Sequence, residues 1–99
     1  MIKQMYNNKQ IVQTDLVVDV DGVRVTYHRC DGMWFVFRVL PSASIERAYT
    51  AVKKIVDIMI RQSKECGQPW DVMEYECEIA SVEQPFHVLR YRFRPRDSQ

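Results

Sequence analysis

Metal-binding and catalytic signatures are what this 99-residue sequence lacks most clearly. Its three cysteines, Cys30, Cys66 and Cys77, are widely spaced, so there is neither a C-x-x-C pair nor the ligand spacing of a zinc site. None of its three glycines belongs to a phosphate-binding loop. We therefore expect no metal, no cofactor and no enzyme. The scattered cysteines favour a reducing cytoplasm, and Cys77 is expected to be a small buried apolar residue.

Long hydrophobic runs and an excess of charge are also missing. No apolar run approaches the roughly 20 residues of a membrane helix, and MIKQMYNNKQ has no signal-peptide core. Fourteen basic and thirteen acidic residues leave a net charge of +1, so charge alone does not imply binding to nucleic acid or membrane. An apolar content of 46% is enough for one core. We expect a single domain over 1–99, with an N-terminal arm over 1–9 and a polar tail over 95–99.

Alternating residues predict a first hairpin around Asp21-Gly22. Both central positions of a type I′ turn need positive φ, which Asp-Gly supplies. The first strand extends back to about Val12, and one register suits both faces of the hairpin. The predicted pairs are Val20 with Val23, Val18 with Val25, Leu16 with Tyr27, Asp19 with Arg24, and Asp15 with His28.

Cys30-Asp31-Gly32 predicts the next turn, as a three-residue loop with Gly32 in the left-handed conformation. A third strand follows over residues 33–40, and Pro41 ends it. This loop places the apolar residues of the strand on the core face. The predicted pairs are Tyr27 with Phe35, Val25 with Phe37, and Val23 with Val39.

A helix is predicted from a cap at Ser42 or Ser44 to about Glu65, with Gly67 and Pro69 ending it. Apolar residues at helical spacing form its buried stripe: Ile45, Ala48, Tyr49, Val52, Ile55, Val56 and Met59. The remaining face is predicted to be outside: Arg47, Ala51, Lys54, Ile58 and Arg61.

Residues 71–79 and 86–94 predict a second hairpin through a turn over 82–86, because one strand alternates acidic residues and the other basic ones. The predicted charge pairs are Glu78 with Arg90, Glu76 with Arg92, and Glu74 with Arg94. The predicted apolar pairs are Ile79 with Leu89, Cys77 with Tyr91, and Tyr75 with Phe93. Arg96 has no predicted partner.

The predicted fold class is α+β: a mostly antiparallel five-stranded sheet in the chain order β-β-β-α-β-β, with one helix packed on one face. The second hairpin can join the sheet beside the first strand or beside the third, and the sequence leaves both arrangements open.

A protein-binding surface is predicted on the sheet face away from the helix, which would leave a tryptophan in water unless a partner covers it. We call this the outer sheet face, formed by Val17, Arg24, Thr26, His28, Trp34, Val36 and Arg38. The hypothesis is a small non-enzymatic adaptor, inhibitor or regulator, of the kind common among phage and mobile-element genes. Its partner would be another protein, a second copy of the chain, or both. An alternative cover is the arm with Met5 and Tyr6.

Two alternative functions remain. Basic residues on the helix and last strand are a candidate nucleic-acid contact: Arg47, Lys54, Arg61, Arg92, Arg94 and Arg96. The opposing glutamates weigh against it. A small-ligand or enzyme site around Asp15 and His28, with Tyr27 nearby, is the second alternative, since a carboxylate can orient an imidazole base.

Overall fold

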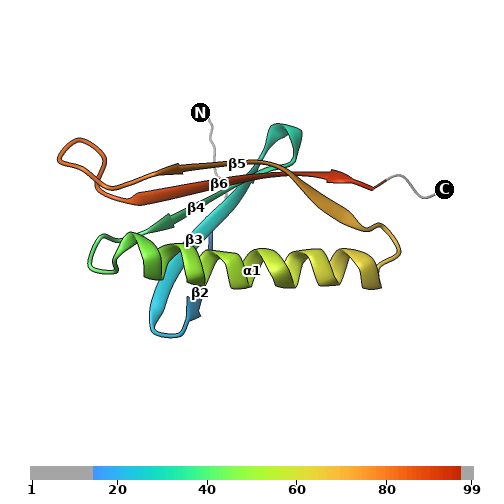
Figure 1. Cartoon of the computed structure of the whole chain (residues 1–99), viewed down its shortest axis with the longest axis horizontal. Coiled ribbons are helices and arrows are strands. Elements are labelled where there is room, and N and C mark those ends of the chain that lie inside the picture. Colours follow the sequence, from blue (N-terminus) through green and yellow to red (C-terminus); the bar gives the residue numbers. More distant parts are fainter. Residues whose placement is uncertain (1–14, 97–99) are drawn as a thin grey trace, which may run out of the picture.

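The computed structural model describes residues 15–96 and shows one antiparallel five-stranded sheet with a single helix (Figure 1). The elements are β2 (Leu16–Val20), β3 (Val23–Cys30), the short 3₁₀ turn η2 (Asp31–Met33), β4 (Trp34–Val39), α1 (Ile45–Glu65), β5 (Trp70–Glu78) and β6 (His87–Pro95). The predicted α+β class is confirmed. The predicted arm, the first strand before Asp15 and the end of the tail lie outside the described residues.

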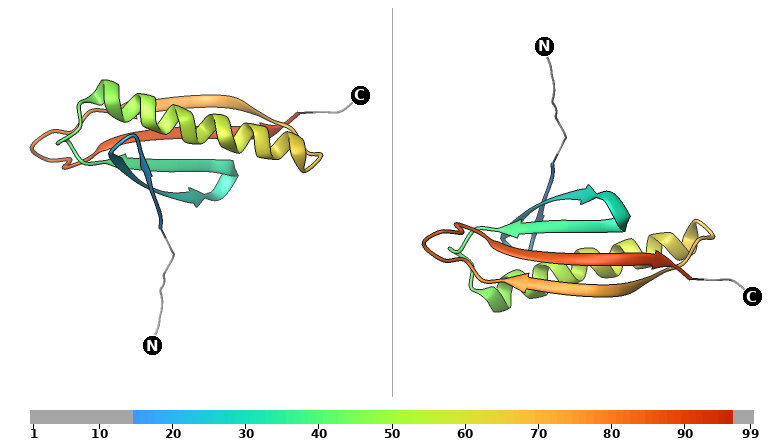
Figure 2. Two further views of the ribbon diagram at one scale, coloured as in Figure 1. Left: turned by 90° about the horizontal axis from the view of Figure 1, so that it is seen from below. Right: turned by 90° about the horizontal axis from the view of Figure 1, so that it is seen from above.

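The second hairpin joins the sheet beside the third strand of the predicted meander. The strand order is β2-β3-β4-β6-β5, so α1 carries the chain from β4 to the far edge and β6 then returns into the gap (Figure 2). This is a split β-α-β arrangement. Among the described strands, β6 is central and β2 and β5 form the two edges. The helix covers one face of the sheet, and no other described helix covers the opposite face.

The first hairpin has the predicted register, from Leu16 opposite Tyr27 to Val20 opposite Val23. Asp21 and Gly22 take φ angles of 52° and 80°, as a type I′ turn requires. The predicted charge pair also forms, because Arg24 Nε lies 3.2 Å from Asp19 Oδ1. Local turn chemistry was sufficient here to fix both faces.

The predicted register of β3 with β4 is wrong by two residues. Tyr27 lies opposite Phe37, and Val25 lies opposite Val39. The loop is Asp31–Met33 because Met33 joins Gly32 in the left-handed region, with φ angles of 64° and 76°, while Cys30 stays in the strand. A methionine rarely adopts positive φ, so this loop was not expected. Since the shift is even, every side chain keeps its predicted face.

The predicted register of the second hairpin is also wrong by two residues. Glu76 lies opposite Arg90 and Glu74 opposite Arg92, and a bulge at Met73 changes the alignment toward the start of β5. The predicted apolar pairs change in the same way, to Tyr75 with Tyr91 and Cys77 with Leu89. Charges that alternate every second residue attract equally well after an even shift, so they fix the face and not the register.

The ends of this hairpin differ from the prediction as well. Strand β5 stops at Glu78 and β6 starts at His87, so the connection spans residues 79–86. Arg96 has a partner after all, because its guanidinium donates to Asp71 at 2.6 and 3.1 Å. This pair lowers the pKa of Asp71 and raises that of Arg96.

Helix α1 begins and ends as the sequence indicates. The Ser44 hydroxyl accepts from the Arg47 amide at 3.2 Å, which selects Ser44 over Ser42 as the N-cap. At the other end, the Gly67 amide donates to the Lys64 carbonyl and the Gln68 amide to the Ser63 carbonyl, which is a Schellman motif. Two predicted faces need correction. Ala51 is buried against the sheet, whereas Tyr49 is 41% exposed at the margin of the stripe.

The core lies between α1 and the three central strands. Its fully buried side chains come from every layer: Val25, Phe37, Val39, Val52, Val56, Leu89 and Phe93. The predicted burial of Cys77 is wrong, because its strand is an edge and the thiol is exposed. All three cysteines are free and exposed.

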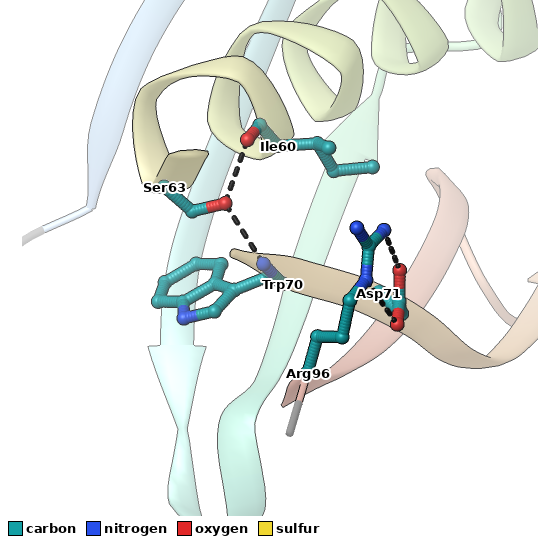
Figure 3. Close-up of polar contacts among 5 residues, drawn as sticks. All are labelled: Ile60, Ser63, Trp70, Asp71 and Arg96. Carbon is teal, nitrogen blue, oxygen red and sulfur yellow. Dashed lines mark hydrogen bonds and ion pairs between the residues drawn. The ribbon is translucent and has the colours of Figure 1, made fainter. Parts of the chain in front are cut away.

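Ser63 links the last turn of α1 to the start of β5 (Figure 3). Its buried hydroxyl donates to the Ile60 carbonyl at 2.6 Å and accepts from the Trp70 amide at 2.9 Å. The bond to Trp70 holds the first residue of the edge strand against the helix. Trp70 itself packs against Phe35 and Phe93, with ring centroids 6.2 and 5.4 Å away.

Ser63→Ala is expected to lower the free energy of unfolding by about 1–3 kcal/mol, because it leaves the half-buried Trp70 N–H without its acceptor. Urea denaturation followed by tryptophan fluorescence measures this loss. Ser42→Ala is the matched control, since Ser42 is exposed and is not the cap. Equal stability of the two variants would show that the Ser63 bridge contributes nothing.

Candidate functional site

The structure brings all seven residues of the outer sheet face onto one surface. Val17 lies opposite Thr26, Thr26 opposite Arg38, and His28 opposite Val36. Their exposure is uneven. Val17 is 58% exposed, but Val36 is buried at 8% and Trp34 is half-buried. The Arg92 guanidinium lies 6.0 Å from the Trp34 ring centroid and donates to the Gly32 carbonyl. Side chains of the sheet therefore cover part of the apolar area that the sequence suggested was open.

The predicted Asp15–His28 contact is present but has a third member. His28 Nδ1 lies 3.4 Å from Asp15 Oδ1 and 3.2 Å from Arg38 Nη1. Arg38 competes with Asp15 for the same ring nitrogen, so the carboxylate alone does not orient the imidazole. Tyr27 lies on the helix side of the sheet, where it stacks on Phe37 at 5.1 Å. The structure does not bring Tyr27 to the other two residues.

The candidate nucleic-acid residues fall into two groups on opposite sides of the sheet. Arg47, Lys54 and Arg61 belong to the helix, whereas Arg92 and Arg94 point from the outer side of β6. Several have acidic partners. Lys54 pairs with Asp21, Arg92 Nη1 lies 2.8 Å from Glu74 Oε1, and Arg96 pairs with Asp71. The set does not form one continuous basic surface.

The most open part of the sheet is the β5 edge, which sequence reasoning did not single out. Strand β5 ends the sheet, and its residues are exposed from Val72 through Glu78. Every second residue of an antiparallel edge directs its backbone N–H and C=O away from its neighbour. No strand within residues 15–96 pairs with these groups, and large apolar side chains accompany them: Val72 is 41% exposed, Met73 47% and Tyr75 43%.

A shallow groove runs between β5 and the first half of α1. We call it the β5 groove; it has a volume of about 390 Å³ and is lined by Ile45, Glu46, Tyr49, Thr50, Tyr75 and Cys77. Tyr75 forms its floor: its ring packs edge-on against Tyr49, with centroids 6.0 Å apart, and at a tilt against Tyr91, with centroids 4.7 Å apart. Burial and the neighbouring Cys77 thiol raise the pKa of Tyr75 to about 12. The groove therefore has an aromatic, uncharged floor directly beside the open strand.

These tyrosines are expected to make the stability of the fold decrease at alkaline pH. Burial raises the pKa of Tyr91 as well, so both phenols ionise less readily when folded than at their ordinary pKa of 10.0. Below pH 10 these phenols are neutral in both the folded and the unfolded protein, and the fold keeps its full stability. Between about pH 10 and about pH 12 they ionise more readily in the unfolded chain, so stability is lost as the pH rises. Urea denaturation at stepped pH is expected to show that loss, reduced in a Tyr75→Phe/Tyr91→Phe variant. Identical slopes in the two proteins would contradict it.

A second groove of about 400 Å³ lies at the opposite end of the helix, beside β2. We call it the β2 groove; its lining includes Leu16, Tyr27, Phe35, Met59, Cys66 and Trp70. It is more apolar than the β5 groove and has no charged residue in its lining. Each edge strand thus contributes to the lining of a groove on the helix side of the sheet.

Within residues 15–96, no group of three or more histidine, cysteine or acidic side chains is arranged to hold a metal ion. The single helix of this part is not long and apolar enough to cross a membrane. No protein-family model, no curated protein and no solved structure matches the chain.

One feature of the sequence does indicate that β5 lies at the edge of the sheet. Val88 and Leu89 are adjacent apolar residues at the start of β6, and both are buried, at 4% and 0% exposure. A strand with apolar residues on both faces is typical of a central position. Since β6 takes that position, its hairpin partner β5 must be at the edge.

Proposed function

We propose that the chain is a small, non-enzymatic, cytoplasmic protein-binding module that acts as an adaptor, inhibitor or regulator by capturing an extended segment of a partner at the β5 edge. The supporting observation is the combination, over one edge strand, of exposed apolar side chains and backbone groups that no other described strand pairs with. An edge of this length is a template for strand addition, in which main-chain hydrogen bonds supply affinity and alternate side chains supply specificity.

The β5 groove supports this proposal from the helix side. A strand added beside β5 would direct alternate side chains toward α1, over Ile45, Tyr49 and Tyr75. Its remaining side chains would lie on the outer side beside Glu74, Glu76 and Glu78. Tyrosine at the centre of a contact surface is common among residues that dominate binding.

The outer sheet face remains a second proposed contact within the same function. Its accessible apolar surface comes from Val17 and from the exposed part of the half-buried Trp34. Arg24 and Arg38 belong to the same face. We propose self-association through this face rather than through β5. Size-exclusion chromatography with light scattering on the wild type and Trp34→Ala tests it. A dimer that Trp34→Ala dissociates is expected, and a wild-type monomer at high concentration would exclude it.

The three exposed cysteines make the test of the β5 edge specific. Cys77 lies in the β5 groove, Cys66 lines the β2 groove, and Cys30 pairs with Trp34 across the outer sheet face. Three single-cysteine variants, with serine at the other two positions, can each be labelled with a bulky maleimide. Each labelled protein is then compared with its unlabelled form for retention of proteins from a host cell extract.

Loss of a retained partner on labelling Cys77, with retention after labelling Cys66 or Cys30, is the expected outcome. Loss on labelling Cys30 alone would overturn the β5 assignment and move the contact to the outer sheet face. Retention by all three labelled proteins, or no specific partner for the unlabelled ones, would overturn the proposal. Circular dichroism confirms that each labelled protein stays folded.

A further inference from the structure

The two flanks of β5 have the same side chains but different neighbours. On one flank β6 supplies Arg90 and Arg92 to the acidic outer side of β5 and Leu89 and Tyr91 to its helix side. On the other flank no described strand pairs with β5. A side chain of an edge strand lies within reach of residues on both neighbouring strands. The open flank therefore presents the same acidic and apolar side chains that pair with the basic and apolar residues of β6 on the closed flank.

The acidic side chains retain capacity for a second set of partners. Glu76 lies opposite Arg90, yet the Arg90 guanidinium contacts Glu78 at 3.2 Å instead. Among the described residues, no ion pair engages Glu76. Glu74 contacts Arg92 through Oε1 alone. A carboxylate accepts several hydrogen bonds through its two oxygens, so a second arginine or lysine can bind on the open side.

Charge also argues against a second copy of β5 as the occupant. A two-fold antiparallel pairing of β5 with itself keeps both helices on one side of the joined sheet. In each register centred on a residue from 74 to 78, at least one of the three glutamates at positions 74, 76 and 78 faces a glutamate of the other copy. Like charges directly opposite each other destabilise a strand pair. A different strand with the complementary pattern is favoured.

We propose that β5 binds an extended segment of another protein in which arginine or lysine alternates with aromatic or aliphatic residues. The basic residues contact Glu74, Glu76 and Glu78 on the outer side, and the apolar residues enter the β5 groove over Tyr49 and Tyr75. This inference rests on the proposed strand capture and adds the chemistry of the captured segment. Residues 88–94 of the chain itself, VLRYRFR, are an example of that chemistry.

Three peptides on one apolar frame test the inference: VLRYRFR, the neutral VLTYTFT and the acidic VLEYEFE. Each is titrated into the ¹⁵N-labelled full chain, and amide shifts are followed by NMR. The basic peptide is expected to shift residues 71–78 and to bind about tenfold more tightly than the neutral one, because three opposite-charge contacts add to the strand pairing. The acidic peptide is expected not to bind. About 1 M salt should reduce the preference.

Charge reversal on the protein supplies the matched control. Glu76→Lys is expected to weaken the basic peptide about tenfold, whereas Glu83→Lys, in the exposed loop, makes the same change of net charge with little effect. Equal affinity of the basic and neutral peptides at β5 would overturn the charge inference and leave strand capture intact. Shifts outside β5 with every peptide, or no shifts, would overturn both. Well-dispersed spectra establish that the variants are folded.

Discussion

Replacement of Phe37 by alanine is expected to lower the free energy of unfolding by about 3–5 kcal/mol. Phe37 is fully buried at the centre of β4, the middle strand, opposite Tyr27 on one side and Leu89 on the other. Its ring stacks on Tyr27 at 5.1 Å and meets the edge of Tyr91 at 6.0 Å. Truncation therefore removes contacts to both halves of the sheet and leaves a cavity beneath α1.

A loss of this size is a large part of the roughly 5–15 kcal/mol that stabilises a typical domain. Urea denaturation followed by circular dichroism measures it. Val17→Ala is the control, because Val17 is 58% exposed on an edge strand and its truncation is expected to change stability by only about 0.5 kcal/mol. If the free energy of unfolding of Phe37→Ala lies within about 1 kcal/mol of the wild-type value, Phe37 is not at the centre of the core.

The second large effect is expected at His87, which holds the loop after β5 to the segment before α1. The buried imidazole lies between two backbone groups: the Ala80 amide donates to Nδ1 at 3.0 Å, and Nε2 lies 2.9 Å from the Ala43 carbonyl. An amide can only donate, so Nδ1 carries no proton and Nε2–H donates to Ala43. Both ring nitrogens are satisfied in this single neutral tautomer.

His87→Leu is expected to cost about 2–4 kcal/mol, because it preserves apolar volume but leaves two backbone groups without partners. The measurement is again urea denaturation. His28→Leu is the matched control on the outer sheet face, where the imidazole contacts Asp15 and Arg38 and a loss of at most about 1 kcal/mol is expected. If both histidine variants lose the same amount, the backbone bonds of His87 are not what fixes the loop.

The sequence patterns predict the helix and the strands of this fold more accurately than the registers in which the strands pair. Asp21-Gly22 fixed the first hairpin because the turn itself has only one good geometry. The second turn depends on Met33 at positive φ, a conformation that methionine rarely adopts, so the local sequence does not predict it. The alignment predicted for the charge-alternating hairpin is wrong because charges with a two-residue period attract equally well after an even shift, and the same pattern does not reveal the bulge at Met73. Ala51 was placed outside because an alanine fits either face of a helix.

The candidate site was harder to predict than the fold because it depends on which strand ends the sheet. The sequence predicts Tyr49 in the buried stripe of the helix and Tyr75 and Cys77 on an apolar strand face, and all three would be covered if β5 were a central strand. They are exposed because β6, and not β5, pairs with β4. Trp34 was expected to be open, but Arg92 reaches it from a strand whose place in the sheet was undecided. Long-range strand order thus determines both surfaces.

Amide hydrogen exchange on the full chain, with and without the VLRYRFR peptide, tests most directly whether β5 is a strand-accepting edge. Alternate amides of residues 70–78, those directed away from β6, are expected to exchange rapidly in the free protein. They are expected to slow about tenfold or more when the peptide is bound, because each then donates to the added strand. Amides of β2 should not change. Slowed exchange in β2 or β3 with unchanged exchange in β5 would contradict the proposed function.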